Sequence, residues 1–206
     1  MILLVCLAFA LPLSAEMRVL AFAASTRADS YNRKLVLEAA EMARKMGAKV
    51  TVVDLKDYTM PFYNADHEAK EGMPAKAMQL RQLMIQSDAI IIASPEYNAS
   101  IPAILKNLLD WTSRGEKGNY SPDAYKGKKF AIMSASPGKM GGARGLVHLR
   151  AVLEAIGGEV VSKQVSITEA HSAFNSKGQL IDPAKKEQLQ EEVQQLLQVK
   201  ANVSPT

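Results

Sequence analysis

The chain has 206 residues, of which 48% are hydrophobic and 22% are charged, as in an ordinary globular protein. A chain of this length buries enough apolar surface to fold as one domain without disulfides or structural metals. Its net charge is only +4 and it has no run of Lys or Arg, which disfavours nucleic-acid binding. The mild positive charge instead favours small anionic molecules as partners.

The first fifteen residues differ from the rest of the chain, since they carry no charge and are almost wholly apolar. They are too few to cross a bilayer, which takes ~20 apolar residues. They match the apolar part of a secretory signal but lack its positive start; alternatively, translation begins at Met17. We favour a cytoplasmic protein, which would be exported if this segment is a real signal. We expect a leader at residues 1–16, one domain at 17–200 and a frayed tail at 201–206.

From Met17 onward, short apolar runs alternate with amphipathic stretches of helical period. The run at 89–93 is the most apolar, as is typical of a central strand in a parallel sheet. We expect strands at 18–24, 49–53, 89–93, 128–134 and 160–165, helices at 30–46, 74–87, 102–112, 142–156 and after Pro183, and a long connection at 54–73. This alternation predicts one α/β domain with a five-stranded parallel sheet and helices on both faces, because each right-handed crossover returns to the same sheet.

The loop after the first expected strand is crowded with polar side chains. These are Ser25, Thr26, Arg27, Ser30 and Asn32. The loop comes just before a helix, whose first backbone N–H groups lack partners and bind anions. The pattern favours a phosphate site in which Arg27 pairs with the phosphate. The alternative is that Ser30 merely caps the helix and Arg27 is a solvated surface residue.

The loop after the third expected strand combines stiffness with a flat side chain. Pro95 and Pro102 restrict it, and Tyr97 offers an aromatic face. Asn98 and exposed backbone N–H groups can hydrogen-bond the edge of a planar heterocycle. This loop is either a ligand-binding segment or an ordinary turn before a helix that begins at Pro102.

The loop after the fourth expected strand is rich in glycine. Gly138, Gly141 and Gly142 permit close approach of the backbone to a ligand, or simply make a tight turn. In open α/β sheets, ligands bind outside the carboxyl ends of the strands. We therefore expect the three loops to form one site.

Several other chemistries lack their motifs. There is no Walker loop, no G-x-G-x-x-G after the first strand and no G-x-S-x-G elbow, which disfavours a nucleotide hydrolase, a Rossmann NAD site and a serine nucleophile. His67, His148 and His171 lack the spacing of metal ligands, so we expect no metal site. We interpret His148 as a packing or interface residue. The single cysteine, Cys6, lies in the leader, which excludes a disulfide framework.

Three motifs in chain order resemble those of the NADPH-dependent FMN reductases, which include flavodoxin-like quinone, azo-dye and chromate reductases. The resemblance covers about residues 17–165. Ala24 stands where that family usually has glycine. The motifs are Ser25-x-Arg27-x-x-Ser30-x-Asn32, then Pro95-Glu-Tyr-Asn98 with Ile101-Pro102 and Leu105-Lys-Asn-Leu-Leu-Asp-Trp111, then Ser136-Pro-Gly-x-x-Gly-Gly142. The resemblance implies a flavodoxin-like fold with strand order 2-1-3-4-5.

The resemblance also implies a cofactor, FMN, and which part of it each loop would contact. The first loop would hold the phosphate, the second would line the isoalloxazine ring and the third would close its other side. The implied residues are Ser25, Arg27, Ser30 and Asn32 for the phosphate, Pro95, Glu96, Tyr97 and Asn98 for the ring, and Ser136, Gly138, Gly141 and Gly142 for the far side. We expect no side chain with an obligatory acid–base role, because the flavin carries the chemistry.

The implied function is electron transfer from NADPH or NADH, through FMN, to a small acceptor such as a quinone, free flavin, azo compound or metal oxyanion. The main alternative is an electron carrier of flavodoxin type, which the basic charge disfavours, and a third is a regulatory module without cofactor. We expect a homodimer or homotetramer, because the apolar residues of the helix at 102–112 exceed what one sheet face needs. We expect no nucleic-acid partner and no membrane span.

Overall fold

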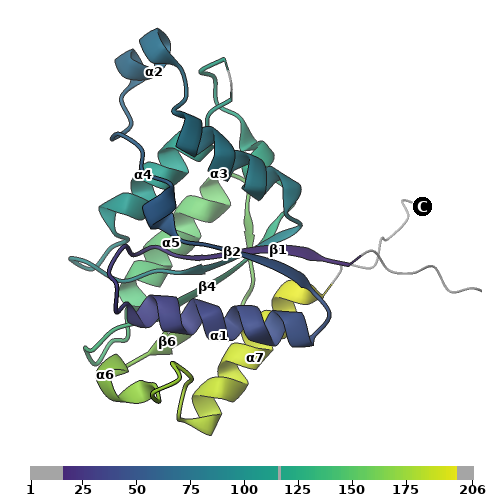
Figure 1. The fold of residues 1–206 in the computed structure, drawn as a ribbon, viewed down its shortest axis with the longest axis vertical. Helices are drawn as coiled ribbons and strands as arrows, with labels where there is room; N and C mark the ends of the chain where they lie inside the picture. The colour runs from purple at the N-terminus through teal and green to yellow at the C-terminus, as the bar shows by residue number, and fades with distance from the viewer. Residues whose placement is uncertain (1–15, 116, 199–206) are drawn as a thin grey trace, which may run out of the picture.

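The computed structural model describes residues 16–115 and 117–198, so residues 1–15 of the expected leader and the whole expected tail lie outside it. Its centre is a parallel sheet in the order β2-β1-β3-β4-β5, with β6 also paired to β4 (Figure 1). The strands are β1 (Arg18–Ala23), β2 (Lys49–Val53), β3 (Ala89–Ala93), β4 (Lys129–Ala135), β5 (Glu159–Val160) and β6 (Val165–Ile167). This order confirms the predicted flavodoxin-like α/β fold.

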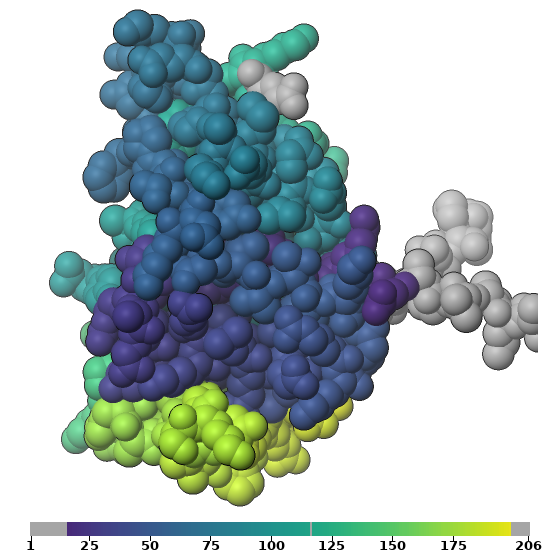
Figure 2. Space-filling model, viewed as in Figure 1, coloured from purple at the N-terminus to yellow at the C-terminus, as the bar shows by residue number. Residues whose placement is uncertain are grey.

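Helices cover both faces of the sheet. Figures 1 and 2 show α1 and α7 side by side on one face, while α3, α4 and α5 cover the other. The helices are α1 (Tyr31–Lys45), α2 (Ala65–Glu71), α3 (Ala75–Gln86), α4 (Ala103–Thr112), α5 (Ala143–Ala155), α6 (Ala170–Ala173) and α7 (Pro183–Leu197), with short 3₁₀ turns η1 (Leu55–Asp57) and η2 (Pro122–Ala124). No helix in the described ranges is long and apolar enough to cross a membrane.

The expected fifth strand at 160–165 is wrong in detail, because the structure divides this segment between β5 and β6. The guanidinium of Arg150 donates to the carbonyl of Val160 at 3.1 Å and to that of Val161 at 2.6 Å. The backbone N–H of Lys163 donates to Gln195 of α7 at 2.9 Å. In the segment that separates β5 from β6, the N–H of Val161 still donates to Phe130 of β4, but the two carbonyls and the N–H of Lys163 bond to side chains of α5 and α7.

The expected long connection at 54–73 contains η1 and α2. Glu68 of α2 is buried, and its carboxylate accepts hydrogen bonds from Arg114 at 3.1 Å and from the hydroxyl of Tyr63 at 3.0 Å. The indole of Trp111 donates to the carbonyl of Pro61 at 2.8 Å. Polar contacts therefore fix the connection to the end of α4. Such contacts need no periodic spacing of apolar residues, so the sequence of this segment shows no helical pattern.

The apolar side chains of α4 do not support the argument for an oligomer. Leu105, Leu108, Leu109 and Trp111 are all at most 2% exposed, so they lie in the core of a single chain. Ile104 is partly buried and packs against the same core cluster, and α3 contacts α4, so most of the apolar surface of this helix is used within one chain.

Candidate functional site

The loops after β1, β3 and β4 meet at the carboxyl edge of the sheet. They enclose a small pocket of about 70 Å³. Its lining includes Ser25, Arg27, Ser30, Tyr31, Asn32, Pro95, Glu96, Tyr97, Ser136 and Pro137. The structure therefore brings together eight of the twelve residues expected at the site, while Asn98, Gly138, Gly141 and Gly142 lie outside this pocket.

The head of α1 presents unused hydrogen-bond donors to this pocket. Ser30 caps the helix, since its hydroxyl accepts from the N–H of Arg33 at 3.3 Å. No described residue accepts a hydrogen bond from the backbone N–H of Tyr31 or Asn32. Helix N-termini carry partial positive charge, so these N–H groups form a ready anion site.

The first loop also holds an unpaired cation. Arg27 is exposed, and within residues 16–115 and 117–198 its guanidinium makes no hydrogen bond or ion pair. Its backbone N–H donates to the hydroxyl of Ser25 at 3.3 Å, which orders the loop. A guanidinium beside a helix N-terminus suits a phosphate, because both contribute donors and positive charge.

Asn32 joins the first loop to the third. Its side chain is buried and makes two bonds to Ala135, at the end of β4: the amide donates to the carbonyl and the amide oxygen accepts from the N–H, both at 2.9 Å. The side chain is thus committed to structure, and only its backbone N–H faces the pocket as a donor. Its predicted role toward a phosphate therefore narrows to that N–H group.

The second loop presents Tyr97 on a tight turn. Tyr97 and Ser100 exchange two backbone hydrogen bonds of 3.0 Å. Between them, Asn98 and Ala99 have φ of 52° and 63°, the left-handed pair of a two-residue hairpin turn. Asparagine tolerates this conformation, whereas alanine pays roughly 1 kcal/mol for it. Tyr97 is 51% exposed, so a strained turn holds a flat side chain at the pocket.

Glu96 fixes the second loop to α5. Its carboxylate accepts from the guanidinium of Arg144 at 2.6 Å and from the backbone N–H of Gly145 at 3.1 Å. Burial opposes ionisation, but these hydrogen bonds and the cation outweigh it and lower the pKa of Glu96 below its usual value. The carboxylate therefore serves to align the loop with the helix, although part of the side chain lines the pocket.

Two glycines of the third loop are required by packing. Gly142 has φ of +87°, and a Cβ there would approach the Cβ of Ser134 to 2.8 Å. Gly141 has φ of +58°, and a Cβ there would lie 3.0 Å from the carbonyl carbon of Ile167 in β6. At Gly138, by contrast, a Cβ would meet only the hydroxyl of Ser136 at an ordinary contact distance of 3.7 Å, and the N–H of Gly138 donates to that hydroxyl at 3.3 Å.

Two features of the site leave no local signal in the sequence. Arg144 pairs with a residue 48 positions away, and nothing near it in the chain indicates that partner. His148 lies on the same helix, exposed, with Nδ1 3.0 Å from the hydroxyl of Ser100. The sequence indicates only that His148 falls within an expected helix. Within the described ranges, no group of three His, Cys, Asp or Glu side chains could hold a metal ion.

Comparisons with known proteins agree with the loops. Residues 17–172 match the family described as NADPH-dependent FMN reductase. An NAD(P)H-dependent FMN reductase of Pseudomonas aeruginosa is 34% identical over 185 residues, which are 89% of this chain and 95% of the relative. A quinone reductase of Escherichia coli is 33% identical over 155 residues, which are 73% of this chain and 77% of the relative.

A solved structure agrees as well. FerB, a flavoenzyme NAD(P)H:(acceptor) oxidoreductase from Paracoccus denitrificans, superposes with a TM-score of 0.74 at 28% identity, over 87% of this chain and 94% of that one. The resemblance expected from the three loops is thereby confirmed. The chain belongs to the NADPH-dependent FMN reductase family.

Proposed function

We propose that this NAD(P)H-dependent oxidoreductase binds FMN at the pocket formed by the three loops and reduces a small acceptor there. The observation that carries the proposal is the pair of unused N–H groups at Tyr31 and Asn32, beside the unpaired guanidinium of Arg27. These donors match a phosphate dianion in charge and in hydrogen-bonding capacity. The hydroxyls of Ser25 and Ser30 can add donors at the same place.

The small size of the pocket supports a placement of FMN in which the phosphate is enclosed and the isoalloxazine ring lies on the open surface. Ligand pockets for whole small molecules typically measure ~300–1,000 Å³. The pocket here is about 70 Å³, which suits the phosphate end alone. Pro95 and the exposed Tyr97 line its outer side, and the amide of Asn98 and the glycines of the third loop lie beyond it, which together make a surface open to a large planar group. Bound FMN would supply the capacity to take electrons from NAD(P)H and release them to the acceptor.

The protein's own residues bind and orient in this scheme. The turn at Asn98 and Ala99 holds Tyr97 in place, and Asn32 holds the first and third loops together. The expectation that no side chain has an obligatory acid–base role fits Glu96, whose carboxylate is occupied by Arg144 and Gly145. For the acceptor we favour quinones and free flavins, the planar molecules that this open surface can admit. The net charge of +4 disfavours a flavodoxin-type carrier.

A homodimer or homotetramer remains our proposal, on different residues from those first expected. Tyr97, Met140 and Val147 are 51%, 54% and 64% exposed and lie on the second loop, the third loop and α5. Apolar side chains that are left exposed around a site suit contact with a second copy. Light scattering over a concentration series tests this proposal, and a monomer at every concentration would refute it.

The experiment that tests the function is the visible absorption spectrum of the purified full chain, recorded without oxygen before and after NADPH. We expect flavin bands that bleach with NADPH and return when a quinone is added. Bands that bleach with dithionite but with neither NADPH nor NADH would favour the carrier. A protein that neither contains flavin nor binds added FMN would refute the site.

A further inference from the structure

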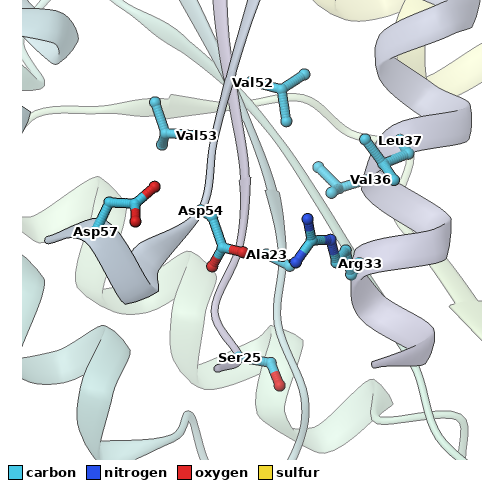
Figure 3. Close-up of a pocket in the computed structure, with 9 residues that line it drawn as sticks. All are labelled: Ala23, Ser25, Arg33, Val36, Leu37, Val52, Val53, Asp54 and Asp57. Atoms are coloured by element: carbon cyan, nitrogen blue, oxygen red, sulfur yellow. Dashed lines mark hydrogen bonds and ion pairs between the residues drawn. The ribbon is translucent and has the colours of Figure 1, made fainter. Parts of the chain in front are cut away.

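A second cavity lies on the other side of the first loop (Figure 3). It measures about 240 Å³ and opens between the carboxyl end of β2 and the first turns of α1. Its lining is Ala23, Ser25, Arg33, Val36, Leu37, Val52, Val53, Asp54 and Asp57. Ser25 lines both this cavity and the phosphate pocket, so the two are neighbours.

The cavity combines aliphatic walls with a charged rim. Figure 3 shows Arg33 and Asp54 pointing toward each other across it, and their ion pair measures 2.6 Å. The other oxygen of Asp54 accepts from the N–H of Lys56 at 3.0 Å, so this carboxylate is held in place as the cap of η1. Asp57 stands opposite, and its carboxylate makes no hydrogen bond or ion pair with any residue of the described ranges. Both carboxylates retain lone pairs that can accept from hydroxyl groups.

The strand order shows on which side of the proposed phosphate site the cavity lies. β1, which leads into the phosphate loop, lies between β2 and β3. The second and third loops follow β3 and β4, so the proposed flavin surface lies on one side of β1 and the cavity on the other. A ligand that continues beyond the flavin phosphate, away from the ring, reaches this cavity first.

We propose that the cavity binds the adenosine half of FAD, so that the chain takes FAD as well as FMN; this inference rests on the proposed placement of the flavin phosphate. The ribose hydroxyls would donate to Asp54 and Asp57, and adenine would pack against Val36, Leu37 and Val52. The remaining N–H groups of Arg33 would face the second phosphate. In nucleotide-binding βαβ units, an acidic residue at the end of the second strand binds a ribose in this way.

The test compares the affinities of the flavin-free full chain for FMN and for FAD by fluorescence titration. The parent should bind FAD at least as tightly as FMN, because the adenosine adds contacts. In Asp54→Asn with Asp57→Asn, the affinity for FAD should fall about tenfold, as expected when hydrogen bonds to charged acceptors are lost. The affinity for FMN should change less than about twofold, and asparagine at position 54 preserves the cap of η1.

A charge-matched control is Asp66→Asn with Glu71→Gln, two exposed residues of α2 outside the cavity. It should bind both flavins as the parent does, and adenosine should compete with FAD but not with FMN. If the cavity variant loses FMN and FAD equally, or if only its KM for NADPH rises, the FAD proposal is overturned. If the parent binds neither flavin, the proposed function itself fails, which is a distinct result.

Discussion

The loops after β1 and β4 lie at the same edge of the sheet but are built in opposite ways. The first has unused donors at Tyr31 and Asn32 and an unpaired Arg27. In the last, Gly141 and Gly142 are pressed against β6 and β4, with no room for a side chain. One loop thus leaves hydrogen-bonding groups without partners in the described ranges, while the other uses its residues to fix the shape of the edge. The comparison predicts that mutations in the first loop affect binding and those in the third affect folding.

The largest effect should come from Gly142→Ala. The new Cβ would collide with Ser134, and a positive φ adds strain, so we expect the free energy of unfolding to fall by about 3 kcal/mol. Urea denaturation measures this change. Gly138→Ala is the matched control, because its Cβ would meet only the hydroxyl of Ser136 at 3.7 Å. Equal losses in the two variants would contradict the packing argument.

Arg27→Ala should act on binding alone. Loss of a charge-assisted contact to the phosphate should weaken FMN binding about 10- to 100-fold. The stability of the flavin-free protein should not change, because the guanidinium has no partner in the described ranges. Fluorescence titration and urea denaturation measure the two quantities. Arg44→Ala, at the far end of α1, removes the same charge as a control; a similar loss of FMN affinity there would point to net charge instead.

Tyr97→Ala tests the open surface between these two loops. Removal of the aromatic face should weaken FMN binding about three- to tenfold or change the ranking of quinone, flavin and azo acceptors. Tyr120→Ala removes a ring of similar exposure, 52% against 51%, at a position outside the pocket. An unchanged flavin affinity together with an unchanged acceptor ranking in Tyr97→Ala would remove this residue from the site.

Glu96→Gln tests whether the contacts of Glu96 with α5 stabilise the second loop, as packing stabilises the third. Because the folded pKa of Glu96 is lowered, its stabilisation is complete above the unfolded pKa of about 4.3 and is lost as the pH falls through the folded pKa. The variant should therefore be less stable than the parent at pH 7, and the difference should narrow below about pH 4. Urea denaturation at several pH values checks this, with exposed Glu71→Gln as the control. A difference that is independent of pH would contradict the role of the ion pair.

The smallest effect is expected at Ala99→Gly. Glycine relieves the left-handed strain at φ 63° but gives up more backbone entropy, so the gain in unfolding free energy should be below about 1 kcal/mol. A thermal melt of the flavin-free protein measures this gain. Gly47 already occupies a left-handed position, and Gly47→Ala should change stability in the opposite direction. A destabilised Ala99→Gly would show that the methyl group makes contacts that outweigh the strain.

The strands could be predicted from the sequence because apolar runs such as 89–93 record burial directly, whereas the strand order was implied by the resemblance to a family. The sequence does not contain the division between β5 and β6, since that depends on Arg150 and Gln195 reaching backbone groups from two separate helices. Helix α2 was missed for a similar reason: it is short, and Glu68 holds it through polar contacts that leave no periodic pattern.

The site shows the same division. The clustering of polar residues around Arg27 and Ser30 is local and therefore readable in the sequence. Asn32 bonds to Ala135 and Glu96 bonds to Arg144, and both partners are far away in the chain. The sequence therefore identifies Asn32 and Glu96 as candidates but does not show that their side chains hold the loops together. The resemblance to a family supplied the residues, and the geometry supplied what each one touches.

The bond between Asn32 and Ala135 joins residues 103 positions apart. A nascent chain leaving the ribosome therefore exposes the complete phosphate loop long before the strand that anchors it has been made. Until residue 135 has emerged, the amide of Asn32 has no backbone partner to hold the loop in register. At the proposed site, FMN capture would accordingly wait until most of the domain has been synthesised, and we expect a chain truncated before β4 to retain no flavin.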